Sequence, residues 1–431
     1  MNTKPQFKPV DEQLAYLRKG AAEIIPEPEL KAKLEKSFRT GTPLRVYLGV
    51  DPTAPDIHLG HTVVLRKLKH FQDLGHTAIF LIGDFSAMIG DPTGRSETRP
   101  PLSREEVDAN AKTYLAQVFK LLDKEKTEVH RNSDWLDKLS SQEIVRLCGH
   151  YRLARMLERE DFRSRLENQQ PISVHELLYP LLTAVDAVEL KSDVELGATE
   201  QKFNLLIHRD IQREYGLEGE VAFTMPILVG LDGQRKMSKS LGNYVGIGEA
   251  PSDMFGKLMS LSDAMMWPYF DLVTDHTPEQ IAALSDEVKS GAKHPMDVKM
   301  SLAKEIIAGF HGEAAAEKAA AEFQRVFRDR EVPKDIAEAK FKRRDGGLVS
   351  SQLPQNRPPG YFHPGSRKWS QMLAYLEVTE SVSEAERIIK HGGLEINGQV
   401  VTDPTTKLDS EQAAAYDVRL GKKKFLRVVV E

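Results

Sequence analysis

The feature that most constrains the fold is an alternation of short apolar runs and amphipathic helical stretches up to about residue 245. Runs of strand length occur at residues 44–50 (LRVYLGV), at residues 77–82 (TAIFLI) and near Val129, and apolar residues recur at helical spacing over residues 58–74 and 104–122. Units of this kind predict right-handed crossovers and a parallel, doubly wound (Rossmann-like) α/β sheet. Ligands of such sheets bind at the carboxyl ends of the strands, where Asp51, His58 and Asp84 are expected.

The chain beyond residue 247 differs in composition from the part before it. Residues 248–342 contain Ala-, Glu- and Lys-rich segments with few strand signals, so we expect an α-helical domain there. Residues 343–365 are rich in proline and basic residues, which predicts a linker. Contact of these basic residues with phosphate is the alternative interpretation.

Residues 366–431 have the local signals of a small α+β domain. Residues 368–376 predict one helix, and Ser383 with Glu386 three residues later predicts the capping box of a second. Asn397-Gly398 between two apolar runs is a strong hairpin signal. The predicted order is therefore a sheet domain over residues 1–247, then the helical domain, the linker and the α+β domain.

Composition limits the classes of function. The chain has 59 Lys and Arg against 64 Asp and Glu, so it lacks the overall basicity typical of nucleic-acid-binding proteins. Residues 366–431 hold as many acids as bases, so a positive face there would require spatial segregation. The single cysteine, Cys148, excludes a disulfide framework and a Cys-based zinc site. No run approaches the roughly 20 apolar residues of a membrane span, so we expect a soluble protein of a reducing compartment.

The first motif is His58-Leu59-Gly60-His61, which follows a predicted strand and turn and opens a helix. A helix N-terminus presents unpaired N–H groups and a positive dipole end, which favour a bound anion. Gly60 allows close approach to the backbone, and the two imidazoles can donate to phosphate oxygens. Taken alone, the motif is equally compatible with two ordinary histidines at a helix start.

The second motif is Lys236-Met237-Ser238-Lys239-Ser240, flanked by Asp232-Gly233 and Leu241-Gly242-Asn243. Two lysines between glycines predict a mobile cationic loop that can clamp a polyphosphate and neutralise a departing pyrophosphate. A lone pair of lysines at this spacing would indicate only a solvated basic loop. The complete string, together with the first motif, favours phosphate chemistry. The glycine pattern of dinucleotide-binding proteins follows none of the predicted strands, so NAD is not expected.

Together the two motifs resemble the signature motifs of class I aminoacyl-tRNA synthetases. More narrowly, residues 47–54 (YLGVDPTA), residues 89–95 (IGDPTGR) and Tyr179-Pro180 leading to Asp186 resemble the bacterial tyrosyl-tRNA synthetases. Residues 366–431 resemble the S4-type RNA-binding domain at the end of those enzymes. The resemblance therefore covers essentially the whole chain.

This resemblance implies a role for each matching residue. Tyr47 and Asp186 would hold the phenolic hydroxyl of the substrate, and phenylalanine would leave both groups unpaired. The implied tyrosine-binding residues are Tyr47, Asp51, Asp91, Tyr179, Thr183, Asp186 and Gln201. The implied catalytic residues are Thr53, His58, His61, Lys236 and Lys239. The implied ATP-binding residues are His58, Gly60, His61, Ala198, Glu200, Lys236, Ser238 and Lys239, and no residue is implied as a metal ligand.

The resemblance also implies partners. ATP with Mg²⁺ would be a substrate, with no tightly bound cofactor. The helical domain would recognise the anticodon region of tRNA(Tyr), and Arg367, Lys368, Arg387 and Lys390 would also bind the tRNA. A region inserted at about residues 130–200 would form a homodimer, and the protein would be cytoplasmic.

Some of these residues have other interpretations when the resemblance is set aside. Tyr47 on an apolar strand is more typical of a core residue, and Asp91-Pro92-Thr93-Gly94 is an ordinary turn signature. Asp186 lies among apolar neighbours, where a carboxylate is costly unless it is paired.

The chain departs from the pattern of that family at four positions. Thr183 stands where Gln is usual, Val185 where Tyr is common, Ala198 where Gly is usual and Glu200 where Asp is usual. A threonine is too short to reach an ammonium group as Gln does, and Glu200 extends its carboxylate by one methylene near the expected ribose. These changes could be compensated locally, or they could alter amino-acid selectivity.

The implied reaction is the activation of L-tyrosine with ATP, followed by transfer of the tyrosyl group to the 3′ end of tRNA(Tyr). Since Tyr47 and Asp186 are both present, tyrosine is the expected substrate. The alternatives are a synthetase paralogue of altered selectivity, another ATP-dependent nucleotidylyltransferase, and a synthetase-derived RNA-binding protein. The last alternative predicts loss of the motif histidines or lysines, yet all four are present.

Overall fold

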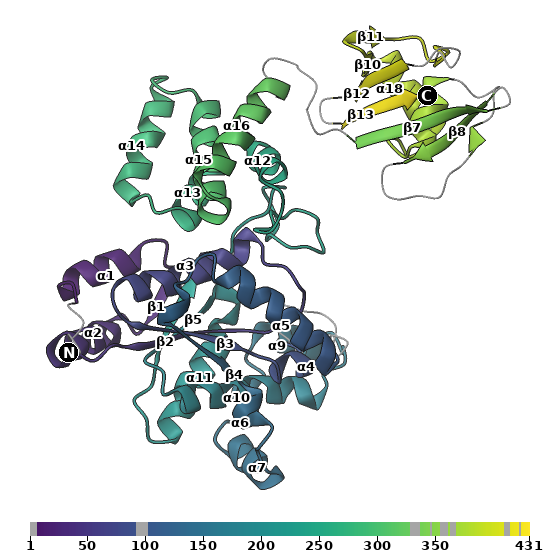
Figure 1. The fold of residues 1–431 in the computed structure, drawn as a ribbon. Helices are drawn as coiled ribbons and strands as arrows, with labels where there is room; N and C mark the ends of the chain where they lie inside the picture. The colour runs from purple at the N-terminus through teal and green to yellow at the C-terminus, as the bar shows by residue number, and fades with distance from the viewer. Residues whose placement is uncertain are drawn as a thin grey trace. The chain divides into compact units, whose positions relative to one another are not determined.

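The chain forms two compact units, residues 1–320 and residues 321–431. The computed structural model describes residues 7–91, 102–327, 337–344, 347–353, 361–362, 368–408, 414–421 and 424–431. Arg367 and the Pro92-Thr93-Gly94-Arg95 part of one motif lie outside these ranges. Each unit has its own sheet (Figure 1).

The first unit contains a six-stranded sheet in the order β1-β6-β5-β2-β3-β4. Its strands are β1 (Glu23–Ile25), β2 (Arg45–Val50), β3 (Thr77–Ile82), β4 (Thr127–Arg131), β5 (Val194–Ala198) and β6 (Val221–Met225). All neighbouring pairs are parallel except β1 with β6, which is antiparallel. The chain winds outward in both directions from the β2–β5 pair. The predicted doubly wound α/β fold is confirmed, and the β2–β5 pair is its switch point.

Helices cover both faces of this sheet (Figure 1). α3 (Leu59–Asp73) packs on β2, β3 and β5, while α10 (Val174–Leu190) and α11 (Lys202–Glu214) pack against each other on the opposite face. One core cluster joins Ala187 and Leu190 of α10 to Tyr47, Ile79 and Leu81 of the strands. The remaining helices before residue 250 are α1 (Val10–Arg18), α2 (Glu27–Thr40), α4 (Ser86–Ile89), α5 (Arg104–Val118), α6 (Ser133–Leu136), α7 (Ser141–Gly149), α8 (Leu153–Met156) and α9 (Glu160–Glu167), with short 3₁₀ turns at Lys124–Lys126 and Thr199–Gln201.

The segment after residue 250 is helical, as the sequence predicts. It comprises α12 (Pro251–Met259), α13 (Met266–Val273), α14 (Pro278–Lys289), α15 (Pro295–His311) and α16 (Glu313–Phe327). α12 packs against α15 and α13 against α3, so these helices belong to the same compact unit as the sheet. Within the described ranges, no helix is both long and apolar enough to cross a lipid bilayer.

The second unit contains a seven-stranded sheet in the order β11-β10-β12-β13-β7-β8-β9. Its strands are β7 (Ala337–Arg344), β8 (Gly347–Gln352), β9 (Tyr361–Phe362), β10 (Leu394–Ile396), β11 (Gln399–Val401), β12 (Ala414–Leu420) and β13 (Lys424–Val430). The two helices are α17 (Trp369–Tyr375) and α18 (Val382–Lys390). One core cluster includes Phe341 of β7, Leu348 of β8 and Trp369 of α17.

Two predicted boundaries were wrong in this region. The expected helical domain over residues 248–342 ends in a strand, and the described part of the expected linker over residues 343–365 continues the sheet. β7 pairs in parallel with β13, which brings residues about 90 positions apart into register. On its other side, β7 pairs antiparallel with β8. Local proline and charge content does not report such distant pairing. The sequence signal for this strand is the alternation of Ala339 and Phe341 with lysines. In the structure, Ala339 and Phe341 are buried and the lysines are more exposed.

Two local features were predicted near the end of the chain, a hairpin turn and a helix cap, and only the first is confirmed. The Asn397-Gly398 hairpin is confirmed, because Ile396 pairs with Gln399 and both turn residues have positive φ (49° and 78°). The predicted cap at Ser383 was wrong. Ser381 caps α18 by accepting from the backbone N–H of Glu384, so the helix begins two residues earlier than predicted.

Candidate active site

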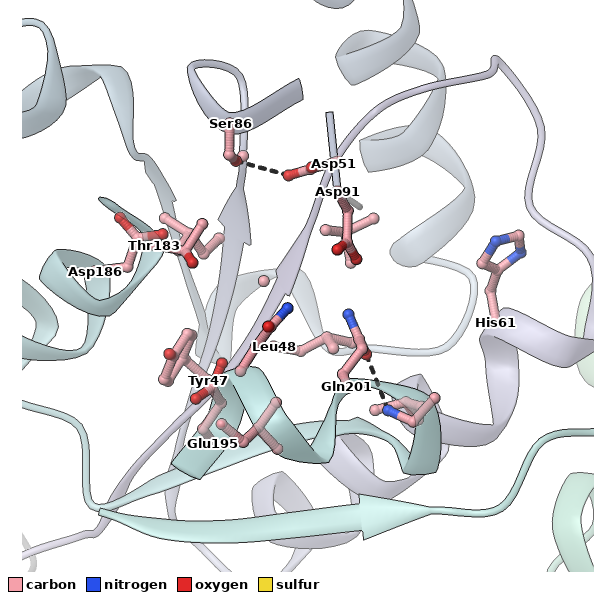
Figure 2. Close-up of a pocket in the computed structure, with 18 of the residues that line it drawn as sticks. Tyr47, Leu48, Asp51, His61, Ser86, Asp91, Thr183, Asp186, Glu195 and Gln201 are labelled. Atoms are coloured by element: carbon pink, nitrogen blue, oxygen red, sulfur yellow. Dashed lines mark hydrogen bonds between the residues drawn. The ribbon is translucent and has the colours of Figure 1, made fainter. Parts of the chain in front are cut away.

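A pocket of about 420 Å³ opens at the carboxyl ends of β2, β3 and β5, at the switch point of the sheet (Figure 2). Its lining includes most of the residues to which the resemblance gives roles, namely Tyr47, Asp51, Thr53, Gly60, His61, Asp91, Tyr179, Thr183, Asp186, Ala198, Glu200, Gln201 and Lys236. His58, Ser238 and Lys239 do not line it. Tyr47 and Asp186 lie at its buried end, and His61 and Lys236 are more exposed.

Asp51 is held in place by hydrogen bonds. The Tyr179 hydroxyl donates to Oδ2 at 3.0 Å, and the Ser86 hydroxyl donates to Oδ1 at 2.7 Å (Figure 2). A Cβ on Gly83 would lie 2.2 Å from Asp51 Oδ1, so only glycine allows this approach. Burial, followed by the charges of Asp51 and Asp91, raises the pKa of Tyr179 well above its ordinary value. Two carboxylates beside a neutral phenol suit an ammonium group.

Asp186 and Tyr47 form the buried end of the pocket. The Trp135 indole donates to Oδ1 of Asp186 at 2.7 Å, and the Asn132 amide donates to Oδ2 at 3.3 Å. Burial raises the pKa of Asp186 well above its ordinary value, although both donors oppose the shift. The Tyr47 hydroxyl has no hydrogen-bond partner among the described residues, and burial raises its pKa well above the ordinary value. A buried donor beside a buried acceptor matches a phenolic hydroxyl, which can use both.

His58 and His61 stack at the start of α3, with ring centroids 3.8 Å apart. His58 Nδ1 accepts from the Gly60 backbone N–H at 3.1 Å, and His61 Nδ1 accepts from the His58 N–H at 3.2 Å. Burial lowers the pKa of His58 to about 2 and that of His61 to about 4, and the nearby Lys239 charge adds to both shifts. Both rings are therefore neutral near pH 7. Because Nδ1 accepts in each ring, the proton lies on Nε2, which is free to donate to a phosphate oxygen.

The lysine loop is held by Asn243. Its amide oxygen accepts from the Ser238 N–H at 2.8 Å, and its amide nitrogen donates to Asp232 at 3.0 Å and to the Lys236 carbonyl at 3.1 Å. Lys239 donates to the Asp56 carbonyl, and burial lowers its pKa. The loop thus has a defined shape, with Lys239 close to the start of α3.

The positions that depart from the pattern of the family each have a local partner. Glu200 accepts from Lys236 Nζ at 3.0 Å with both oxygens, and Gln201 accepts from the Ala198 N–H at 2.9 Å. The Thr183 hydroxyl lies 2.9 Å from Nε2 of the buried His208. Val185 belongs to an apolar cluster between α10 and α11.

The residues expected to bind tRNA lie in the second unit. Lys368 precedes α17 and is half-buried, while Arg387 and Lys390 are exposed on the last turn of α18. Arg367 lies outside the described residues.

Four further residues shape the site, and none of them was given a role from the sequence. They are Ser86, Asn132, Trp135 and Asn243, each of which holds a residue with an implied role. Asn132 and Trp135 follow β4, at the same edge of the sheet, so the strand pattern could have indicated them. Asp84, expected near the ligand, instead accepts from Ser133 and Arg131 and is fully buried.

Comparison with known proteins agrees with this geometry. The family model for class I tRNA synthetases (W and Y) matches residues 39–328, and the S4 domain model matches residues 371–413. The tyrosine–tRNA ligase of Oleidesulfovibrio alaskensis is 51% identical over 98% of this chain and 99% of its own length. The corresponding ligase of Moorella thermoacetica is 49% identical over 97% of this chain and 96% of its own.

Solved structures show the same fold at lower identity. A truncated mitochondrial tyrosyl-tRNA synthetase of Aspergillus nidulans aligns with a TM-score of 0.62 and 21% identity, over 74% of this chain and 94% of that chain. Tyrosyl-tRNA synthetase from Archaeoglobus fulgidus, complexed with L-tyrosine, aligns with a TM-score of 0.57 and 24% identity, over 72% of this chain and 100% of that chain.

The chain therefore belongs to the class I aminoacyl-tRNA synthetases, which confirms the expected family. Within that class it belongs with the bacterial tyrosine–tRNA ligases.

Proposed function

We propose that the chain activates L-tyrosine with ATP and transfers the tyrosyl group to tRNA(Tyr), the reaction of the ligases with which it belongs. The observation that carries this proposal is that Tyr47 and Asp186 lie at the buried end of a pocket that also presents His61 (Figure 2). Lys236 lines the same pocket. One end suits a phenol and the other a phosphate. Asp51 and Asp91 line the same pocket and would face the substrate ammonium group.

In the first step, the tyrosine carboxylate attacks the α-phosphorus of ATP, and pyrophosphate leaves. The nucleophile is already an anion, so the protein has to supply position and charge stabilisation rather than a base. The Nε2–H groups of His58 and His61 would donate to phosphate oxygens. Lys236 and Lys239 would leave Glu200 and the Asp56 carbonyl to neutralise the departing pyrophosphate.

ATP would enter as its Mg²⁺ complex, which lowers the charge that the lysines must balance. Glu200, at the end of β5, would accept from the ribose once Lys236 has moved to the phosphates. Gly60 would allow the nucleotide to approach the start of α3.

In the second step, a terminal ribose hydroxyl of the tRNA attacks the activated carbonyl, and AMP leaves. The S4 domain would bind the tRNA through Lys368, Arg387 and Lys390, with Arg367 as a further candidate. The helices α12 to α16 would recognise the anticodon region.

We further infer a homodimer and a cytoplasmic location. Val145, Leu153, Leu166 and Val174 are each more than half exposed, and all lie in the region inserted between β4 and β5. The gathering of exposed apolar side chains in this one inserted region supports an interface between two copies. The lone thiol Cys148 and the use of ATP and tRNA agree with the cytoplasm.

Tyrosine-dependent ATP–pyrophosphate exchange tests the proposal, with phenylalanine as the competing substrate. We expect exchange with tyrosine and little with phenylalanine. Exchange that depends on another amino acid would favour the synthetase paralogue of altered selectivity, for which the Thr183–His208 contact is the specific observation. Absence of exchange with every amino acid would favour the synthetase-derived RNA-binding protein.

A further inference from the structure

A chain of buried polar groups lies behind the tyrosine pocket. It consists of Glu195 on β5, His208 on α11 and Glu220 just before β6, all buried. Glu195 and His208 also line the pocket, and Glu195 is the direct partner of Tyr47 across the β5–β2 ladder (Figure 2). The reaction proposed above uses none of the three. Buried acids are costly, so their presence beside a substrate pocket requires an explanation.

His208 connects this chain to the pocket wall. Its Nε2 lies 2.9 Å from the Thr183 hydroxyl, and its Nδ1 lies 2.8 Å from Oε2 of Glu195. The Thr183 hydroxyl is also 2.9 Å from the Tyr179 carbonyl oxygen, one helical turn earlier. At the other end, the Ser192 hydroxyl donates to Glu220.

Burial favours the neutral form of all three side chains. A carboxylate oxygen of each acid and a ring nitrogen of His208 all lie within 4.8 Å of one another. Burial raises the pKa of Glu195 above its ordinary value, and burial together with the Glu195 charge raises that of Glu220 well above its ordinary value. Burial lowers the pKa of His208 to about 4, so its ring is neutral. The other charges that act on the group are those of Asp186 and Asp91, while Tyr47 is a neutral phenol.

The hydrogen bonds of Thr183 set the direction of this chain. Its hydroxyl donates to the Tyr179 carbonyl, so Nε2 of the neutral His208 ring donates to the Thr183 oxygen, and Nδ1 of that ring accepts from Glu195. The remaining lone pair of the Thr183 oxygen is available to the pocket that it shares with Asp51 and Asp91 (Figure 2). A neutral imidazole also avoids the repulsion that an imidazolium would exert on a bound ammonium group.

We propose that His208 is a positioning residue for the amino group of tyrosine. Glu195 orients its imidazole, and the imidazole holds the Thr183 oxygen with its remaining lone pair toward the substrate. This inference rests on the proposed function. It explains how a short threonine at position 183 can serve a tyrosine site.

Thr183→Val tests the hydroxyl at nearly constant shape. In ATP–pyrophosphate exchange by the full-length protein, KM for tyrosine should rise about 10-fold, the usual order for one lost hydrogen bond to a charged group. KM for ATP should not change, and Thr183→Ser should restore the wild-type value.

Thr274 provides a matched control. Its hydroxyl donates to the Phe270 carbonyl one turn earlier at 2.6 Å and lies 3.2 Å from Nδ1 of His276, but it does not line the pocket. Thr274→Val should lower Tm about as much as Thr183→Val does and should leave KM for tyrosine unchanged.

The role of Glu195 is tested by substitution. Glu195→Leu, which removes the partner of His208 Nδ1, should raise KM for tyrosine. Glu195→Gln, which keeps a donor to Nδ1, should raise it less. His208→Gln, which keeps an amide near the Nε2 position, should raise KM for tyrosine less than His208→Leu.

Three results would decide against this inference or its basis. Unchanged KM for tyrosine in both Thr183→Val and His208→Leu would overturn the role of His208, provided that the wild type is active. A wild type without tyrosine-dependent exchange would instead overturn the proposed function. A stoichiometric metal ion in the purified protein that is lost in Glu220→Gln would make His208 a metal ligand and would also overturn the inference.

Discussion

Single residues set the chemistry at the buried end of the pocket. Asp186 accepts from Trp135 and Asn132, so its carboxylate is paired before any substrate binds. The Tyr47 hydroxyl, in contrast, has no partner among the described residues and is available to a ligand. A tyrosine phenol would donate to Asp186 and accept from Tyr47, whereas phenylalanine would leave both unpaired.

Asp186→Asn should therefore weaken the preference for tyrosine over phenylalanine. A buried hydrogen bond to a charged group contributes about 1.5–3 kcal/mol, so we expect a loss of roughly 10- to 150-fold in the ratio of kcat/KM values. Trp135→Phe, which removes only one donor to the carboxylate, should have a smaller effect. Retained selectivity in Asp186→Asn would show that the phenol binds elsewhere.

At the scale of elements, the site lies at the carboxyl ends of the neighbouring strands β2 and β5, where the lysine loop approaches the start of α3. The sequence predicts a mobile loop between two glycine-containing turns, yet Asn243 holds its centre with three hydrogen bonds. Lys236 and Lys239 are each bound to a protein acceptor at opposite sides of this loop. The loop is therefore positioned to exchange these acceptors for phosphate oxygens.

Lys239→Ala should lower the rate of tyrosyl-adenylate formation by about 100-fold, because a charge that stabilises the departing pyrophosphate is lost. Binding of tyrosine, measured by equilibrium dialysis, should be nearly unchanged, since Lys239 does not line the pocket. Lys289→Ala, at an exposed lysine of α14, is the control. An unchanged rate of pyrophosphate release in a single turnover would rule out this role for Lys239.

At the scale of the whole molecule, the chain forms two compact units. Every residue that lines the pocket belongs to the first unit, and the S4 domain belongs to the second. The second unit has its own sheet and its own apolar core. Under the proposed function, activation should therefore be separable from the part of tRNA binding that the S4 domain supplies.

A chain that ends at Phe327 should still catalyse tyrosine-dependent ATP–pyrophosphate exchange at a rate within about twofold of the full chain, because its pocket is complete. Charging of tRNA(Tyr) should fall by at least about 10-fold, since the S4 domain is absent. Equal charging by both chains would show that the first unit alone binds the tRNA.

Stability should decrease as the pH falls from 6 toward 5. Five histidines in the described part of the chain have pKa values lowered to about 4 or about 2, namely His58, His61, His70, His76 and His208. Each binds a proton only on unfolding in the window between its folded pKa and the unfolded value of about 6.5. Asp186, Glu195 and Glu220 have raised pKa values and release protons on unfolding in the same window, but they are fewer.

The net uptake of protons means that the free energy of unfolding should rise with pH over this range. Denaturant titrations at pH 5.0, 5.5 and 6.0 would measure it. His70→Gln, at a buried histidine outside the pocket, should reduce the slope. A free energy of unfolding that is constant or falls with pH would contradict this account.

The sequence by itself determined the central strands and the motifs of the first unit, because those signals are local. Residues 77–82 form the predicted strand, α3 lies within the helix predicted over residues 58–74, and the motif residues Gly60, His61 and Lys236 meet at the predicted edge of the sheet. Tertiary structure alone decided which distant groups became partners. The residues of β7 were expected to lie at the end of a helical domain. The pairing of β7 with β13 could not be predicted from their composition. The contact between Thr183 and His208 could not be predicted from the sequence either. This contact gives a partner to the threonine that stands where glutamine is usual in the family. The physical reason is the same in both cases: hydrogen bonds between segments far apart in the chain depend on packing, which no local pattern of residues reports.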